Sequence, residues 1–508
     1  MRKKYQRTSG VLHFIGKLLS YFSPLTLLPL VLVFIYWNKP TENHLTLITF
    51  IGTAALSLLL GLILQKIFTN KEIDATGSML ICALGWIFIS AIGAIPYIFI
   101  IDASIIDSFF EAVSGFTTTG ITVFSGLDAM PYSLLFWRAL TQWIGGLGIL
   151  SLFLVIAYQS GGYHHIYLAE SHKISSSRPR PGLANTLKII WGVYLLFTIL
   201  ATIMYFIGGM PIFDSITHAF TTLSTGGFSP HDASIAYYAS HNYNYFKFIE
   251  YAVTFFMLLG GINFIIHFRL ITGEIEALWD NTEIRLWWKL LGIFIFIIMF
   301  SHLLDAGIFQ KILAGNHLNI LQKLETTFRK VSFQVVSITT TTGFGTQSIG
   351  SSYFPAIAKQ LFLVMMVIGG CVGSTGGGIK VLRVAALKKL LTREISKIRL
   401  PKHAIKDLVI DGNLIPKDEI HRISALFFGW ILLLVIGGTI TSFFTNLTGW
   451  ESFSGMFSAL GNIGPSYITV KEMISIDPIV KITYIFGMLA GRLEIIPILL
   501  LFTKKAWK

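Results

Sequence analysis

Four short segments rich in threonine, serine and glycine recur along this 508-residue chain, and their residue types suit one kind of chemistry. They are 116–122, 223–229, 340–346 and 461–466. Peptide carbonyls and Thr or Ser hydroxyls supply oxygens that can replace the water around a dehydrated cation. A glycine in each segment permits the positive φ that points successive carbonyls in one direction. The segments contain no Asp or Glu, which argues against a calcium-type ring of carboxylates.

The candidate ion-coordinating residues come from all four segments. They are Thr118, Thr119, Gly120, Ser224, Thr225, Gly226, Thr341, Thr342, Gly343, Asn462, Ile463 and Gly464. For one segment taken alone, a Thr-rich turn or a contact between helices through small residues is the better explanation. Four copies in matching surroundings favour a shared ion filter instead.

Each segment lies between two long apolar stretches and directly follows a short one. Short stretches such as 107–116 and 213–222 cannot cross a bilayer, because a spanning helix needs about 20 residues. We expect them to be re-entrant helices whose partially negative C-terminal ends favour a cation in a central cavity. Asp107, Asp214 and Glu451 lie near the starts of three of them, where helix capping explains a carboxylate better than attraction of ions does.

Apolar stretches long enough to span a membrane recur through the chain. Ten spans are expected, at 18–37, 45–64, 79–101, 134–157, 187–207, 246–268, 286–304, 354–391, 423–445 and 479–502. The predicted fold is an all-α polytopic membrane protein, in which four pseudo-symmetric helix, pore loop, helix repeats surround a central pore and two further transmembrane helices precede them. The divisions are 1–78 for the N-terminal part and 79–184, 185–285, 286–420 and 421–508 for the repeats.

Composition and charge also indicate a membrane protein. Apolar residues make up 53% of the chain and charged residues 13%, about half the charge of a soluble domain. The net charge of +13 comes from Lys and Arg grouped between the apolar stretches. This is the positive-inside pattern rather than a nucleic-acid surface, and an even number of spans places both termini in the cytoplasm. The basic start resembles a secretory signal but lacks a cleavage site, so a retained anchor is expected.

The run 369–378 is a candidate gate, because six of its ten residues are glycine and each weakens a helix by about 1 kcal/mol. We expect the span 354–391 to break there into a flexible loop below the third filter segment. The gate residues are Gly370, Gly373, Gly376, Gly377, Gly378, Lys380 and Arg492. A phosphate-binding loop is disfavoured, since no strand precedes the run and the Gly-Lys-Ser/Thr ending is missing. Close helix packing through small residues stays open.

Four charged positions within the expected spans need an explanation. Arg492 should face the bundle interior or water, since a charge at the membrane centre costs about 3 kcal/mol. Facing a cation pathway, it would raise an electrostatic barrier; the alternative is structural pairing with backbone carbonyls or with Glu494. Arg138 is near the outer end of its span and is expected to snorkel. Lys380 and Arg383 are expected to begin the cytoplasmic half of the interrupted span.

The four segments, together with the runs 369–380 and 491–494, resemble those of the Trk/Ktr/HKT superfamily of potassium transporters, specifically its bacterial TrkH type. The likeness covers nearly the whole chain, and the two extra N-terminal spans resemble TrkH rather than the eight-span Ktr subunits. In this superfamily a glycine at each filter position goes with potassium preference, and Gly120 is intact. Leu223 and the fourth segment depart from the Thr-Thr-Thr-Gly form, so the four-fold symmetry is expected to be approximate.

The resemblance implies more than the residues themselves do. It implies potassium uptake across the bacterial inner membrane, with K+ as the transported ion and no bound organic cofactor. It also implies a homodimer among membrane lipids, a cytosolic nucleotide-binding partner of the RCK type (TrkA-like), an intramembrane gating loop at 369–379 and a flux-limiting Arg492. Coupling of transport to protons or sodium stays open.

Two other classes of function are alternatives to transport of potassium. A membrane-embedded enzyme is disfavoured, because no HExxH motif, no paired intramembrane aspartates and no Ser/Lys or Ser/His arrangement is recognisable. An ammonium or sodium pathway would use the same scaffold. His164, His165 and His172 lie in an expected cytoplasmic loop and are interpreted as a solvated face. With only Cys82 and Cys371 present, neither a disulfide framework nor a CxxC metal site is available.

Overall fold

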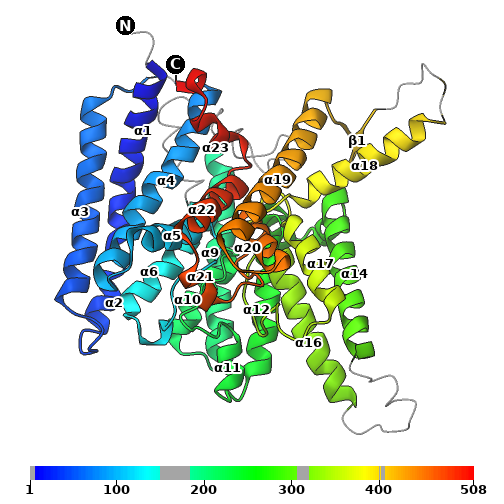
Figure 1. Ribbon diagram of the computed structural model, residues 1–508, viewed down its shortest axis with the longest axis horizontal. Helices are drawn as coiled ribbons and strands as arrows, with labels where there is room; N and C mark the ends of the chain where they lie inside the picture. The colour runs from blue at the N-terminus through cyan, green and yellow to red at the C-terminus, as the bar shows by residue number, and fades with distance from the viewer. Residues whose placement is uncertain are drawn as a thin grey trace.

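The chain is almost entirely helical. The computed structural model describes residues 6–71, 73–148, 183–305, 320–399, 401 and 407–507 (Figure 1). The only strands in these ranges are β1 (Val409–Ile410) and β2 (Asn413–Leu414), which form an antiparallel hairpin. The predicted all-α class is therefore confirmed.

Six helical stretches among the described residues are long and apolar enough to cross a membrane. They are Gln6–Ile35, made of α1 (Gln6–Phe22), η1 (Ser23–Leu27) and α2 (Leu30–Ile35), then α3 (His44–Ile67), α4 (Ala75–Ile100), α9 (Leu183–Ile207), α14 (Thr282–Asp305) and α19 (Lys417–Phe444). The pair α12 (Phe246–Gly261) and α13 (Phe264–Ile271) makes a seventh if it is counted as one span, although it is bent by 106°.

The remaining expected spans are not single helices. The span 134–157 begins as α6 (Tyr132–Trp143) and the π-helical turn η3 (Ile144–Gly148), and its second half lies outside the described residues. The span 354–391 divides into α17 (Ala356–Val367) and α18 (Val381–Lys397), as its glycines predict. The prediction of one helix over 479–502 is wrong: α22 (Pro478–Arg492) and α23 (Ile496–Leu501) are separated by Glu494 and Ile495, whose positive φ angles of 63° and 68° cannot continue a helix.

Four helices end directly in the glycine-bearing segments. They are α5 (Ile105–Phe116), α10 (Ile212–Leu223), α16 (Ile320–Thr339) and α20 (Gly449–Gly461). Three of them have 12 or 13 residues, about 20 Å of helix, which is less than the hydrocarbon core of a bilayer. The start of α20 is a capping box between Thr448 and Glu451, so the capping role predicted for Glu451 is confirmed.

Both chain ends lie at one end of the molecule, the end from which α18 also projects (Figure 1). The Arg7 guanidinium donates to the Ala506 carbonyl at 3.0 Å, and the Thr8 hydroxyl donates to the Trp507 carbonyl at 2.7 Å. The short elements η2 (Leu127–Ala129), α11 (Ala236–Ser240), η4 (Ile275–Leu278), α21 (Val470–Ser475) and η5 (Lys504–Trp507) complete the described structure.

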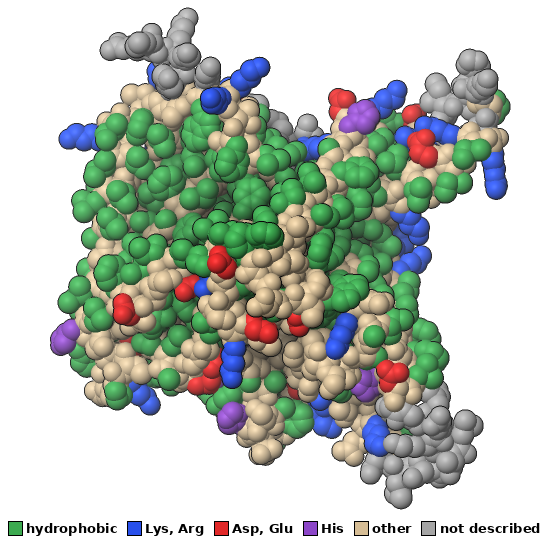
Figure 2. All heavy atoms as spheres, in the orientation of Figure 1, with side chains coloured by type: hydrophobic (Ala, Val, Ile, Leu, Met, Phe, Trp, Pro, Cys, Tyr) green, Lys and Arg blue, Asp and Glu red, His purple; other side chains and the backbone are tan. Residues whose placement is uncertain are grey.

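Apolar side chains cover much of the surface in the view of Figure 2. Exposed apolar residues lie on the long helices, for example Leu59 on α3, Phe206 on α9, Phe296 on α14 and Phe428 on α19. Water-soluble proteins rarely expose apolar patches of this extent. These helices therefore face lipid, and the polar segments are buried inside the bundle.

Candidate ion pathway

The four segments follow the same backbone course. In each, a residue of positive φ precedes a glycine of positive φ by two positions: Thr118 and Gly120, Thr225 and Gly227, Thr341 and Gly343, Asn462 and Gly464. The residue between them donates its N–H to the carbonyl five positions earlier, at 2.8 to 3.0 Å. The four bonds run from Thr119 to Ser114, from Gly226 to Thr221, from Thr342 to Ser337 and from Ile463 to Ser458. The four residues directly before these glycines, Thr119, Gly226, Thr342 and Ile463, are buried.

The second segment differs by one position from its sequence-based alignment. Gly226 is predicted to be its glycine of positive φ, yet the residue with positive φ is Gly227, at 77°. Gly226 instead corresponds to Thr119, and Thr225 rather than Ser224 corresponds to Thr118. Two adjacent glycines can each adopt positive φ, so the local sequence does not distinguish them.

The segments close into a ring. A Cβ atom built on each glycine would meet a peptide oxygen of the next segment. The Cβ of Gly120 would lie 2.1 Å from the Gly226 oxygen, and that of Gly227 would lie 2.1 Å from the Thr342 oxygen. The Cβ of Gly343 would lie 2.0 Å from the Ile463 oxygen, and that of Gly464 would lie 2.9 Å from the Thr119 oxygen. Real Cβ atoms essentially never approach another atom within 3.0 Å. Each glycine thus abuts the peptide before the next glycine, in the order one, two, three, four and back to one.

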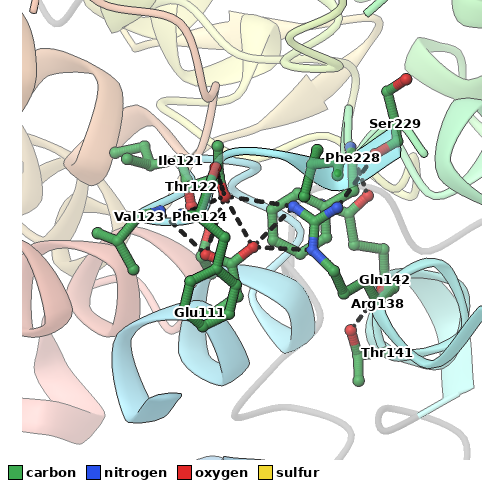
Figure 3. Close-up of polar contacts among 12 residues, drawn as sticks. Glu111, Ile121, Thr122, Val123, Phe124, Arg138, Thr141, Gln142, Phe228 and Ser229 are labelled. Atoms are coloured by element: carbon green, nitrogen blue, oxygen red, sulfur yellow. Dashed lines mark hydrogen bonds and ion pairs between the residues drawn. The ribbon is translucent and has the colours of Figure 1, made fainter. Parts of the chain in front are cut away.

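A buried ion pair supports the first and second segments (Figure 3). The guanidinium of Arg138 on α6 donates to Glu111 Oε1 on α5 at 2.7 and 2.9 Å, and to the Ser229 carbonyl at 3.0 Å. Its carbon lies 4.2 Å from the ring centroid of Phe228. The side chain is 2% exposed, so the prediction that Arg138 snorkels is wrong. Burial is tolerated because Glu111 supplies the opposite charge, which no local pattern revealed.

Gln142, also on α6, holds the second segment directly. Its Nε2 donates to the Gly226 carbonyl at 2.6 Å, and its Oε1 accepts from the Phe228 N–H at 2.9 Å. Sequence reasoning missed this residue. The available signal was an amide side chain inside the expected span 134–157, one turn after Arg138. A polar side chain buried there needs hydrogen-bond partners, which predicts a structural contact.

Two further ion pairs link helices that are far apart in the sequence. Lys481 on α22 lies 2.5 Å from the Asp107 carboxylate on α5, and Arg329 on α16 pairs with Glu250 on α12. Asp107 lies in the first turn of its helix, where the Ser104 hydroxyl caps its N–H at 3.1 Å. Asp107 therefore combines the expected helix-end position with an ion pair between α5 and α22.

A histidine joins the loops that follow the first and second segments. His231 follows the second segment and lies 2.5 Å from Asp128 and 2.9 Å from Asp214, and its ring stacks on Tyr237 at 3.5 Å. Burial lowers the pKa of His231, but the hydrogen bonds and charges of Asp214 and Asp128 outweigh it and raise that pKa above 6.5. Asp214 lies in the first turn of α10, as expected, but no side chain caps that helix. Its carboxylate instead contacts His231 and accepts from the Tyr238 hydroxyl.

The glycine-rich loop lies against three of the four segments. The Gly377 N–H donates to the Thr341 hydroxyl at 2.8 Å, and the Thr375 hydroxyl lies 3.3 Å from that of Thr225. A Cβ on Gly377 would be 2.6 Å from the Asn462 Cβ. The residues contacted are those of positive φ in segments two, three and four.

The predicted gate glycines all lie in this close-packed loop. A Cβ atom built on each of them would contact a neighbour in the bundle. The contacts are Gly370 with Ser374, Gly373 with Asn263, Gly376 with the Thr340 carbonyl, Gly377 with Asn462, and Gly378 with Gly369. Gly373 and Gly378 have positive φ angles of 76° and 65°, so they also need glycine for conformation.

Arg492 connects the loop to the first segment. Its guanidinium donates to the Thr375 carbonyl at 2.7 Å and to the Thr118 hydroxyl at 3.2 Å, and also to the carbonyls of Gly145 and Gly146 at 2.9 and 3.0 Å. Glu494, an alternative partner considered from the sequence, instead pairs with Arg383. Arg492 therefore bonds backbone carbonyls, as the structural alternative expected, but these carbonyls belong to the loop and to the first repeat.

The two ends of the loop are held from α14. Glu283 Oε1 accepts the Val372 N–H at 2.8 Å and the Leu382 N–H at 3.1 Å, and this carboxylate is buried. Lys380 precedes α18 as its N-cap residue, and its ammonium donates to the Gly376 carbonyl. Sequence reasoning found Lys380 but missed Glu283, which lies 89 and 99 residues before the two N–H groups it binds.

Comparison with known proteins decides the family. A family model, TrkH, described as a cation transport protein, matches residues 48–508. The Trk system potassium uptake proteins TrkH of Salmonella typhimurium and Escherichia coli K12 are each 31% identical over 98% of this chain and 99% of their own length. This chain belongs to the TrkH family. The predicted resemblance is confirmed.

The TrkH-family fold is confirmed by a solved relative. The crystal structure of the potassium transporter TrkH from Vibrio parahaemolyticus matches with a TM-score of 0.83 and 29% identity, over 99% of this chain and 100% of that one. Membership in this transport family, rather than in a family of enzymes, agrees with the sequence prediction. The histidines at 164, 165 and 172 lie outside the described residues.

Proposed function

We propose that this TrkH-family chain carries K+ into the cell across the bacterial inner membrane, through the ring made by the four glycine segments. The observation that carries the proposal is the closure of that ring, in which each glycine abuts a peptide of the next segment. Rings of carbonyl oxygens replace the hydration shell of K+. The helices that end in the ring add partial negative charge, which favours a cation there. The relatives named above are potassium uptake proteins.

The loop 369–379 and Arg492 are proposed as the gate. The loop contacts the residues that precede the ring glycines, and Arg492 adds a positive charge between the loop and Thr118. A fixed cation beside the pathway repels K+. The described arrangement is thus interpreted as the closed state, and opening requires Arg492 and the loop to move together.

The assembly follows from the TrkH resemblance. We propose that the chain acts as a homodimer with a cytosolic nucleotide-binding subunit of the RCK type (TrkA-like), and that both termini are cytoplasmic. The contact between the chain ends supports a common side for the termini. The divisions at 79, 185, 286 and 421 are proposed as the repeat boundaries.

Reconstitution tests the transport proposal. The purified chain in liposomes should take up rubidium in competition with potassium, and sodium should compete far less. Absence of cation flux from well-folded protein, or equal competition by sodium, would contradict the proposal. The reversal potential under separate potassium and proton gradients decides whether transport is coupled. A reversal potential set by potassium alone indicates a channel, and a shift with the proton gradient indicates symport.

A further inference from the structure

A basic hollow lies between α14, α18 and the β1 hairpin, away from the ion pathway. Its volume is about 540 Å³. The basic residues that line it are Arg285, Lys289, Lys388, Lys389 and Arg393, and the acidic residue Asp407 also lines it. Figure 2 shows Lys and Arg side chains along the edge where α18 leaves the bundle. We call this hollow the α14/α18 basic pocket.

The positive charge of the pocket is only partly neutralised. Arg393 is hydrogen-bonded to Glu394 at 2.7 Å, whereas Arg285 is 4.0 Å from Asp411. Lys389 donates to the Val409 carbonyl at 3.0 Å, which leaves its charge uncompensated. Within the described ranges, neither Lys289 nor Lys388 has a carboxylate within 4.0 Å. Several unmatched cations around one hollow favour an anion with several oxygens.

An apolar stripe continues from the basic pocket along the same face of α14. The helical spacing of four, four, three and four residues places Arg285, Lys289, Ile293, Phe296 and Phe300 in one line. The last three are exposed, at 53%, 68% and 46%. The line thus changes from two cations to three apolar side chains on a helix that faces lipid. This order matches a phospholipid, whose charged headgroup is joined to acyl chains.

Tryptophans mark the depth of the pocket. Trp288 on α14 lies next to Lys289 and is 38% exposed, and its indole N–H donates to the Leu278 carbonyl at 2.9 Å. Trp279, just before α14, is 55% exposed. Tryptophan is enriched where the bilayer meets water, at the level of the headgroups. The basic pocket therefore opens at headgroup depth.

We propose that the α14/α18 basic pocket binds the headgroup phosphate of an anionic phospholipid, whose acyl chains lie along the apolar stripe of α14. Basic pockets between transmembrane helices on the cytoplasmic side suit such headgroups. A free phosphate or an acidic protein surface would satisfy the cations but would leave the apolar stripe without a role. The site is separate from the ring and the loop, so its test needs no transport measurement.

Native mass spectrometry of the purified full-length chain tests the proposal. Phosphatidylglycerol should be retained in preference to phosphatidylcholine. In K289Q/K388Q its affinity should fall about 30-fold, because each cation near an anionic surface contributes a factor of about five. The conservative variant K289R/K388R should retain it. The matched control K504Q/K505Q removes two exposed lysines of η5 at the end shared by the termini and should bind as the unmodified chain does.

Two outcomes would overturn the lipid assignment. One is equal retention of phosphatidylglycerol by K289Q/K388Q and K504Q/K505Q. The other is binding of inorganic phosphate that depends on Lys289 and Lys388 without any preference between the two lipids, which would assign the pocket to a soluble anion. Both lysines are exposed, so the variants are expected to fold, and gel filtration checks this.

Discussion

Replacement of Gly120 by alanine should open the ring between the first and second segments. The new Cβ would lie 2.1 Å from the Gly226 oxygen, and it must retreat to at least 3.0 Å. The two segments must therefore separate by about 0.9 Å, the difference between these distances. Functional oxygens have to be held within about 0.5 Å of their working geometry. We expect the ratio of potassium to sodium permeability to fall at least about tenfold, which equals about 1.4 kcal/mol.

Gly126 provides the matched control. It lies six residues after Gly120 and also has a positive φ, 73°, but a Cβ there would meet nothing within 4 Å. Gly126→Ala and Gly120→Ala thus introduce the same side chain and similar backbone strain, about 1 to 2 kcal/mol each. Only Gly120→Ala adds the collision.

The assay is the reversal potential of liposomes that contain each variant, with potassium on one side and sodium on the other. Gly126→Ala should keep the permeability ratio of the unmodified chain. An unchanged ratio in Gly120→Ala would refute the reasoning, and so would an equal loss in both variants, since strain alone would then explain it. Equal amounts of monodisperse protein are required for the comparison.

Three other changes test the supporting contacts. Arg492→Ala should raise rubidium flux into liposomes severalfold, since it removes the cation that bonds Thr375 and Thr118; lower flux from normally folded protein would assign Arg492 a structural role only. Arg138→Met should destabilise the fold by about 3 to 5 kcal/mol, because it leaves the Glu111 carboxylate buried and unpaired, and adding Glu111→Leu should restore much of the loss in thermal unfolding. His231→Gln should reduce stability more below pH 6.5 than at high pH: the pKa of His231 is raised in the folded chain, so its stabilisation is complete below 6.5 and disappears as the pH rises through the raised value. A pH-independent difference between the two proteins would contradict the assignment of charge to this clamp.

Local sequence patterns were sufficient to predict the long apolar helices and three of the four ring glycines. The apolar stretches of α3, α4 and α19 are long and continuous, and Gly120, Gly343 and Gly464 are each the glycine of positive φ in their segment. The choice between Gly226 and Gly227 depends on which of them meets the third segment. That contact joins residues more than 100 positions apart, so no local pattern reveals it.

Side chains that act over long sequence separations were not predictable in the same way. Glu111 and Arg138 look like ordinary charges until the fold brings α5 against α6 and buries both. Glu283 begins α14 and resembles a first-turn acid, yet its partners are the N–H groups of Val372 and Leu382. The break before α23 also has a distant partner, since Glu494, which lies at the bend, pairs with Arg383.

A ring built within one polypeptide has four unequal quarters. Gly120 abuts the peptide of Gly226, Gly227 abuts the peptide of Thr342, and Gly343 abuts the peptide of Ile463. Gly464 abuts the peptide of Thr119, with a wider distance from its Cβ position to the peptide oxygen. In a channel made of four identical subunits, one gene change alters every quarter together. Here a single substitution alters one wall and leaves three intact. Under the filter role proposed for the ring, single substitutions would therefore change ion preference in smaller steps along this chain than in a symmetric tetramer.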